Sequence, residues 1–171
     1  MDIVIKETQF SDLTHIQSLW NDGDVMYYVG FPDGLGITVP ELEKWLAHIL
    51  EKRPHQKNHY SIYDNEGNYC GEAYYAIDAA LSIAAVDIKL FCHARGKGIA
   101  KKALLHAINE AFNHGATEVY VTPNIDNTRA IKLYQTLGFQ KQPAPLELFA
   151  EPLSEKYIYM TMTNEGMNCQ F

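Results

Sequence analysis

A short glycine-rich, basic segment lies between an expected strand and an expected helix. It reads Arg95-Gly96-Lys97-Gly98-Ile99-Ala100 and is followed by Lys101. Two glycines let a backbone approach a ligand closely. The first turn of the helix offers unpaired N–H groups and the positive end of the helix dipole. Because Arg95, Lys97 and Lys101 add positive charge, the segment predicts a site for a phosphate or pyrophosphate group.

Two common nucleotide-binding patterns do not fit this segment. The dinucleotide pattern GxGxxG/A, started at Gly96, needs a small residue where Lys101 stands. The Walker pattern needs a GK[ST] sequence, which the chain lacks. An ordinary glycine-rich turn with basic surface residues has the same composition. The segment taken alone therefore leaves a phosphate site and a structural turn open.

A second motif follows the next expected strand and reads NTRAIKLYQTLGF from Asn127 to Phe139. The two motifs together resemble those of the GNAT superfamily of N-acetyltransferases. The acetyl-coenzyme A motif of that superfamily, [QR]xxGx[GA], is matched by Arg95, Gly98 and Ala100. The downstream motif, NxxAxxLYxxxGF, is matched by Asn127, Ala130, Leu133, Tyr134, Gly138 and Phe139.

The resemblance implies an acyl-CoA N-acyltransferase fold. It also implies an enzyme that moves an acetyl group from acetyl-coenzyme A to a primary amine by direct attack, with no metal ion. In the superfamily the motif asparagine contacts the cofactor arm, and the motif tyrosine protonates the departing thiolate as a general acid. These roles fall on Asn127 and Tyr134.

The spacing of Asn127 and Tyr134 is compatible with these roles. Seven residues on a helix are two turns, or about 10 Å, so the two side chains share a face. A phenol with a pKa near ~10 can protonate a thiolate whose conjugate acid has a pKa near ~8.5. Spacing alone also fits an aromatic core residue at Tyr134 and a helix N-cap at Asn127.

The resemblance assigns a further role to the strand that precedes the glycine-rich segment. In the superfamily, backbone groups of this strand pair with the pantetheine arm, and one N–H polarises the thioester carbonyl as in an oxyanion hole. By position these groups belong to Ile88, Lys89 and Leu90. A bulge commonly splays the strand open there. Cys92 stands where relatives often have proline, which leaves the exact register open.

Neither motif supplies a general base. Relatives often carry an acid on the strand before the asparagine motif, where this chain has Thr122. Asp87 is the candidate in its place, because it lies on the cofactor-presenting strand in otherwise apolar company, where partial burial would raise its pKa. Glu72 is the second candidate and a water relay without a dedicated base is the third. A structural role for Asp87 also stays open.

The periodicity of apolar residues predicts the elements that must position these groups. Before the glycine-rich segment we expect a strand at 3–5, helices at 12–20 and 38–52, a hairpin of strands at 59–64 and 69–77, and a strand at 82–91. After it we expect a helix at 98–114, a strand at 118–122, a helix at 127–137 and a strand at 157–162. This order predicts an α+β fold with a mixed, mostly antiparallel sheet of six or seven strands flanked by helices. Residues 1–171 are expected to form a single domain.

The segment 21–37 is expected to be a long glycine-rich loop, and long ordered loops are often binding loops. It carries Tyr27, Tyr28 and Phe31 together with Asp22, Asp24 and Asp33. In the superfamily this loop borders the acceptor cleft. The loop is therefore a candidate for receiving a cationic amine.

Composition excludes several other classes. Fourteen Lys and Arg against 21 Asp and Glu give a net charge of −7, which argues against a nucleic-acid partner. No metal-ligand spacing occurs among the seven histidines. Cys70, Cys92 and Cys169 are far apart, and the chain shows neither a signal peptide nor an apolar run of ~18 residues. A cytoplasmic protein with no membrane partner is expected.

The acceptor stays open between a small molecule and a peptide. The segment PNIDNTRAIKLYQTLGF is also similar to aminoglycoside 6′-N-acetyltransferases, and an acidic cleft would suit such polycations. A binding module that holds acyl-coenzyme A without catalysis is the alternative from another class. The sequence also leaves a homodimer open.

Overall fold

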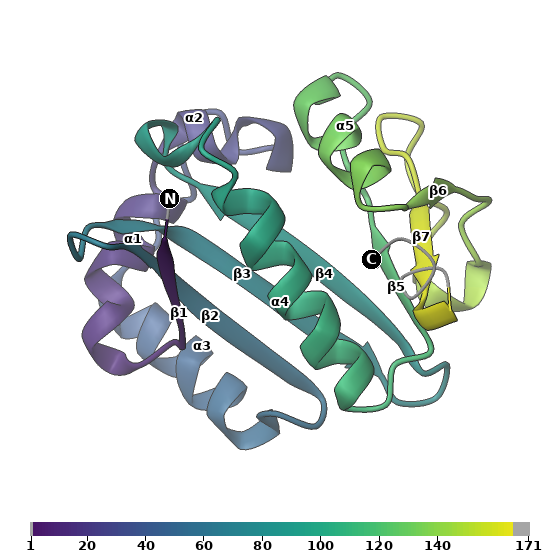
Figure 1. Ribbon diagram of the computed structural model, residues 1–171, viewed down its shortest axis with the longest axis horizontal. Helices are drawn as coiled ribbons and strands as arrows, with labels where there is room; N and C mark the ends of the chain where they lie inside the picture. Colours follow the sequence, from purple (N-terminus) through teal and green to yellow (C-terminus); the bar gives the residue numbers. More distant parts are fainter. Residues whose placement is uncertain (1, 166–171) are drawn as a thin grey trace.

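Seven strands form one sheet, which the computed structural model describes within residues 2–165 (Figure 1). The strands follow the spatial order β1-β2-β3-β4-β5-β7-β6. Their bounds are β1 (Ile3–Glu7), β2 (Lys57–Asp64), β3 (Tyr69–Asp78), β4 (Ile83–Leu90), β5 (Glu118–Val121), β6 (Gln140–Lys141) and β7 (Met160–Thr163). β4 and β5 run parallel, and the other neighbouring pairs run antiparallel. The predicted mixed, mostly antiparallel sheet is confirmed.

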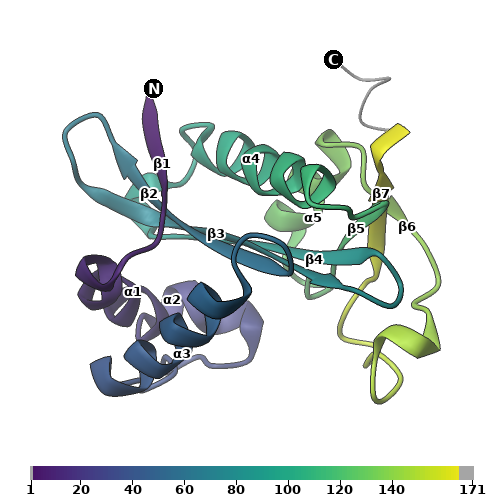
Figure 2. The same ribbon diagram turned by 90° about the horizontal axis from the view of Figure 1, so that it is seen from below.

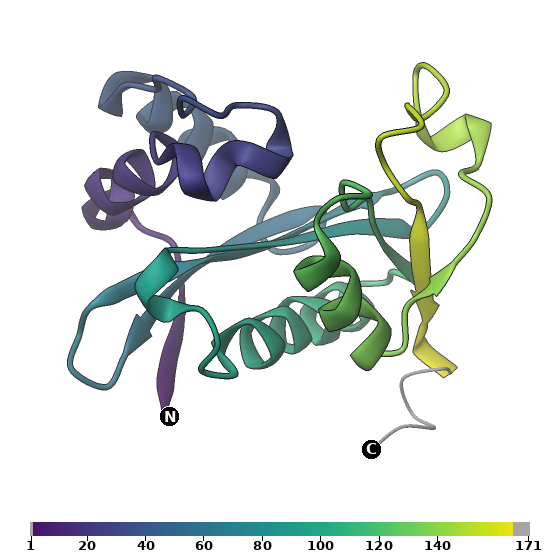
Figure 3. The same cartoon turned by 90° about the horizontal axis from the view of Figure 1, so that it is seen from above.

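Helices cover both faces of this sheet (Figures 2 and 3). α4 (Ile99–Asn113) and α5 (Thr128–Thr136) lie on one face, and α1 (Leu13–Trp20), α2 (Gly23–Met26) and α3 (Val39–Lys52) lie on the other. α4 packs on the sheet through an apolar stripe with no exposed surface, made of Ala103, Leu104, Ala107 and Ile108. Within residues 2–165, no helix is long and apolar enough to cross a membrane.

The helix ends follow the signals in the sequence. α3 begins with a capping box, in which the Glu41 carboxylate accepts a hydrogen bond from the backbone N–H of Thr38 at 2.9 Å. α4 has Gly98 as its N-cap residue, and α5 has Asn127. The two motifs found in the sequence therefore stand at the N-termini of two helices on the same face of the sheet.

Two local expectations are wrong, and one short strand is additional to those expected. The segment 21–37 is not an open loop, because the Asp22 side chain caps the short helix α2 and a 3₁₀ turn follows at Tyr27–Val29. The last long strand begins at Met160, since Tyr157 makes only an isolated bridge to Asn124. β6 was not expected, because two residues are too few to give a periodic pattern.

β4 and β5 stay together over only three residue pairs, from Ile83–Glu118 to Ala85–Tyr120. Beyond Ala85, β4 continues to pair with β3 as far as Leu90. Within the part of the chain that the structure describes, residues 86–90 therefore have no strand partner on the side of β5, and we call this stretch the open edge of β4. The expected bulge is wrong, because the β3–β4 register runs without a shift. The edge is open because β5 separates from β4.

Candidate active site

The loop between β4 and α4 has the backbone shape that its glycines allow. Gly96 and Gly98 have φ values of 76° and 77°, in the left-handed region that favours glycine. A Cβ added at either position would meet nothing within 4 Å. Both glycines and Lys97 are exposed, and none of the described side chains caps the first turn of α4. A phosphate group therefore has access to this helix N-terminus.

The other residues of this loop differ in what they can offer. The Ile99 side chain is buried in the core, so only its backbone can face a ligand. Ala100 is half-buried, and Lys101 is exposed on the first turn of α4. Arg95 makes two contacts that the sequence does not predict: Nε donates to the carbonyl of Leu90 at 3.0 Å, and Nη2 donates to the carbonyl of Asp24 at 3.3 Å. Arg95 thus joins the loop to β4 and to α2.

The backbone groups of β4 alternate between β3 and the open edge. The N–H of Phe91, just after β4, donates to the carbonyl of Cys70 on β3. Since successive backbone groups of a strand point to opposite sides, the groups of Lys89 also face β3, and those of Ile88 and Leu90 face the open edge. Of the three predicted strand residues, Ile88 and Leu90 therefore have backbone groups at the open edge, where the Leu90 carbonyl already accepts Arg95 and the Ile88 N–H already donates to Asp87.

Tyr134 and Asp87 lie on opposite faces of the sheet near residues 86–90. Tyr134 lies on α5, is 6% exposed and packs in the core cluster that contains Val86 and Leu90. Side chains alternate along a strand, so Asp87 and Lys89 point to the face covered by α1 and α3. Burial raises the pKa of Tyr134 well above its usual range, the charge of Asp87 raises it further, and Lys89 lowers it. The phenol therefore stays protonated and lies within electrostatic reach of both charges.

Asn127 is an N-cap residue, as its spacing also allowed. Its side-chain oxygen accepts a hydrogen bond from the N–H of Ala130 at 3.2 Å. The cap uses the oxygen of the amide, so the NH₂ group remains suited to donate to a ligand.

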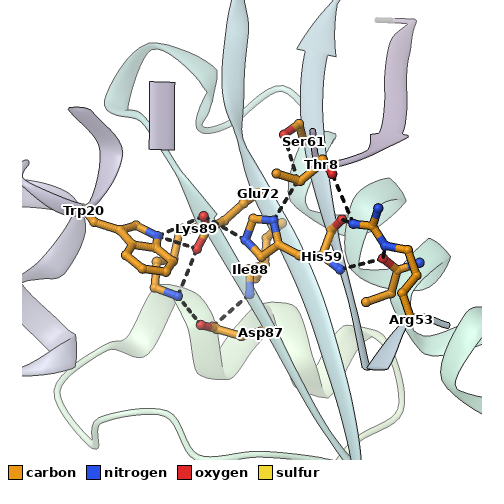
Figure 4. A network of polar contacts seen from close by, with 10 residues as sticks. Thr8, Trp20, Arg53, His59, Ser61, Glu72, Asp87, Ile88 and Lys89 are labelled. Atoms are coloured by element: carbon orange, nitrogen blue, oxygen red, sulfur yellow. Dashed lines mark hydrogen bonds and ion pairs between the residues drawn. The ribbon is translucent and has the colours of Figure 1, made fainter. Parts of the chain in front are cut away.

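Asp87 does not have the apolar company that the sequence predicts. One carboxylate oxygen, Oδ2, is paired with the ammonium group of Lys89, and the other, Oδ1, accepts the N–H of Ile88 at 2.8 Å (Figure 4). The side chain is 47% exposed. Asp87 is therefore a half-exposed, ion-paired carboxylate at the open edge, and it remains the candidate base.

Glu72, the second candidate base, is the centre of a buried polar network (Figure 4). It is 2% exposed and contacts the Trp20 indole N–H at 2.8 Å, His59 Nε2 at 3.1 Å and Lys89 Nζ at 3.2 Å. The Thr8 hydroxyl is hydrogen-bonded to the other ring nitrogen of His59, Nδ1, at 2.7 Å. Burial by itself would raise the pKa of Glu72, but Lys89 and His59 lower it to about 2. A carboxylate bound in this way does not take up a proton near neutral pH.

Sequence reasoning missed this network. Glu72 and Lys89 stand directly opposite each other in the β3–β4 register, so a cross-strand pair of opposite charges was the available signal. Trp20 and His59 gave no signal, because they come from α1 and β2 and meet Glu72 only in the folded chain. Thr122, where relatives often carry an acid, is half-buried just after β5.

A surface hollow of about 630 Å³ lies between the segment that joins β4 to α4 and the β2–β3 hairpin. His93 and Lys97 line it from the loop, and Asp64 and Tyr69 line it from the β2–β3 hairpin. Its lining contains neither Asp87 nor Tyr134. The hollow is therefore separate from the open edge of β4.

Comparisons with known proteins agree with this geometry. Residues 35–139 match the model of the acetyltransferase (GNAT) family. No curated protein matches the chain. A structure of spermidine N-acetyltransferase from Vibrio cholerae in complex with CoA and spermine has 19% sequence identity and a TM-score of 0.81, and the match covers 97% of this chain and 98% of that chain. A ribosomal-protein-alanine N-acetyltransferase from Brucella melitensis has 16% identity and a TM-score of 0.74 over 94% and 99% of the two chains. The predicted acyl-CoA N-acyltransferase fold is confirmed.

Proposed function

Because the chain belongs to the GNAT family of acetyltransferases, we propose that residues 1–171 form a single N-acetyltransferase domain with the open edge of β4 as its site of transfer. Its acetyl donor is acetyl-coenzyme A. One observation carries the choice of site: Asp87 lies at the unpaired strand edge, and Tyr134 packs in the core cluster of Val86 and Leu90 on the other face of the sheet, within electrostatic reach of Asp87. An acid and a base on the two sides of one edge suit a reaction in which a proton is removed from an amine and given to a thiolate.

The glycine-rich loop suits the pyrophosphate of the donor. Its open glycines, the uncapped N-terminus of α4 and the exposed Lys97 and Lys101 support this role. Asn127 has an amide NH₂ to offer to the pantetheine arm, and Ile88 and Leu90 have backbone groups on the open edge. When bound, acetyl-coenzyme A supplies a thioester whose carbonyl carbon the amine attacks and whose thiolate departs.

Backbone and side-chain groups of the chain stabilise or neutralise the charges that develop during acetyl transfer. The N–H of Ile88 stabilises the negative charge on the carbonyl oxygen. Asp87 receives the proton that the amine loses, and Tyr134 gives its proton to the thiolate. Lys89 forms an ion pair with one oxygen of Asp87, and Glu72, opposite on β3, forms a second ion pair with Lys89. Positioning and electrostatic stabilisation then supply most of the rate.

The acceptor we propose is a small polycationic amine. The net charge of −7 and the acidic residues Asp22, Asp24 and Asp33 favour a cation. Tyr27 and Tyr28 on the same segment are 60% and 37% exposed, and aromatic faces attract ammonium groups. The Vibrio cholerae relative was solved with spermine. Aminoglycosides satisfy the same charge argument, and a peptide N-terminus does so less well.

A panel assay of thiol release tests this function. Spermidine, spermine, an aminoglycoside and an alanine-terminated peptide are each incubated with acetyl-coenzyme A, and free coenzyme A is measured. We expect turnover with at least one of the polycations. Acetyl-coenzyme A should also raise the melting temperature, whereas NAD and ATP should not. Binding of acetyl-coenzyme A without turnover of any amine would favour the non-catalytic binding module.

Location and assembly are also proposals. The free thiols of Cys70 and Cys92 suit the reducing cytoplasm, while Cys169 lies outside the described residues. A homodimer stays a prediction. The Vibrio cholerae relative also has a dodecameric structure, which matches with 19% identity and a TM-score of 0.76 over 99% of this chain and 98% of that chain. Sedimentation velocity separates a monomer, a dimer and a larger ring by mass.

A further inference from the structure

The carboxylate of Asp87 occupies a backbone donor that belongs to its own strand. Oδ1 accepts the N–H of the next residue, Ile88, at 2.8 Å, while Oδ2 pairs with Lys89 (Figure 4). Lys89 in turn lies 3.2 Å from Glu72. The two oxygens therefore have different partners: one is held by a buried ionic network, and the other is held by a single N–H.

That N–H is a donor on the open edge. The alternation set by the Phe91–Cys70 hydrogen bond directs the backbone groups of Ile88 away from β3. β5 pairs with β4 only as far as Ala85, so no strand among the described residues takes this donor. The one acceptor that the described residues supply to it is Asp87.

We propose that Asp87 blocks the Ile88 N–H until the thioester carbonyl oxygen of acetyl-coenzyme A takes over this donor, and that the exchange frees Oδ1 to accept the N–H of the incoming amine. The inference rests on the proposed function. It makes Asp87 responsive to the cofactor: the base becomes available at the moment when the acetyl group is in place.

The contacts favour such an exchange. Asp87 is 47% exposed, so solvent and amine can reach Oδ1 as it leaves the Ile88 N–H. Lys89 keeps Oδ2 throughout, so the exchange leaves no charge unpaired. The backbone N–H also keeps a partner at every stage, which avoids the cost of an unsatisfied donor.

Calorimetric dissociation constants for acetyl-coenzyme A and for coenzyme A test the proposal. Coenzyme A has no thioester carbonyl. Its dissociation constant therefore changes with every effect of a variant except the one on the hydrogen bond to the Ile88 N–H. Asp87→Ala should tighten acetyl-coenzyme A relative to coenzyme A by about 3- to 10-fold, the equivalent of one hydrogen bond that no longer has to be displaced. The same variant should lose turnover, since it lacks the base.

Two further variants serve as controls for this interpretation. Asp87→Asn keeps the size of the side chain and should change the ratio in the same direction by less, because an amide oxygen is a weaker acceptor than a carboxylate. Asp78→Ala removes a carboxylate that also accepts backbone N–H groups, at the far end of β3, and should leave the ratio unchanged. An unchanged ratio in both folded Asp87 variants overturns the inference alone. A wild-type protein that binds neither ligand overturns the proposed function and the inference with it.

Discussion

Glu72 and Lys89 stand opposite each other on β3 and β4, with their charged groups 3.2 Å apart beneath α1. Taking two charges out of water is costly, and their attraction offsets that cost only if the remaining lone pairs and protons are also bonded. Trp20 and His59 bond to Glu72, and Asp87 bonds to Lys89. The pair therefore links the core under α1 and α3 to the Asp87 carboxylate at the open edge.

Glu72→Gln should destabilise the fold. The substitution leaves the ammonium group of Lys89 with one charged partner in place of two, and removing one member of a buried pair costs about 3 kcal/mol or more. We expect a loss of this order in the free energy of unfolding, measured with urea. Glu43→Gln is the matched control, because Glu43 is exposed on α3, and it should stay within about 0.5 kcal/mol of the wild type. Equal stabilities of the two variants would show that the network contributes nothing.

The same pair makes stability depend on acid. Burial opposes ionisation of Glu72, but Lys89 and His59 lower its pKa from 4.5 to about 2. A carboxyl group whose pKa is lower in the folded state stabilises the protein fully above its unfolded pKa and loses this contribution as the pH falls through the folded value. Between about pH 4.5 and 2 the wild type should therefore lose more stability than Glu72→Gln. Parallel stability curves for the two proteins in that range would contradict the assignment.

Local signals in the sequence were sufficient for much of this fold. Period-2 and period-3.6 patterns located the hairpin of β2 and β3 and the long helices α3 and α4. Gly98 and Asn127 marked two helix starts that the structure has at the same residues. These features depend on neighbouring residues, which the sequence shows directly.

Features that depend on distant residues were not predictable in the same way. The surroundings of Asp87 were wrongly expected to be apolar. Lys89, two residues further along β4, points to the same face as Asp87 and also contacts Glu72 on the neighbouring strand. The opening of β4 was ascribed to a bulge, although it depends on where β5 turns away. Arg95 was assigned to the cofactor alone, since its contact with Asp24 joins residues 71 positions apart. Only the three-dimensional arrangement shows such relationships.

Substitution of Gly98 should separate cofactor binding from backbone strain. Gly98 and Gly115 stand at the two ends of α4 with φ values of 77° and 102°, and a Cβ would meet nothing within 4 Å at either. Alanine at each position should cost about 1 kcal/mol of left-handed strain. Gly98→Glu should abolish acetyl-coenzyme A binding, because it places a negative charge where we propose that the phosphate group binds. Gly115→Glu should keep the wild-type dissociation constant in calorimetry. Similar affinities of both glutamate variants would place the pyrophosphate elsewhere.

Tyr134→Phe tests the general acid. The substitution keeps the ring, which packs 5.7 Å from that of Phe139, and removes only the hydroxyl. We expect kcat to fall by about 10²- to 10⁴-fold, the usual contribution of general acid catalysis, with little change in the dissociation constant of acetyl-coenzyme A. Burial raises the pKa of Tyr134 above its ordinary value, so the wild-type rate should not decline through deprotonation of this residue below pH 10.

Tyr75→Phe is the matched control for that experiment. Tyr75 is a fully buried tyrosine on β3, and its hydroxyl donates to the carbonyl of Pro54 at 2.5 Å. Loss of this hydrogen bond should lower the melting temperature and leave kcat unchanged, the opposite of the result expected for Tyr134→Phe. The two variants together separate a hydroxyl that stabilises the fold from one that acts in the reaction. If Tyr134→Phe keeps the full kcat on a true substrate and behaves like Tyr75→Phe in stability, Tyr134 is a packing residue and the thiolate leaves without its help.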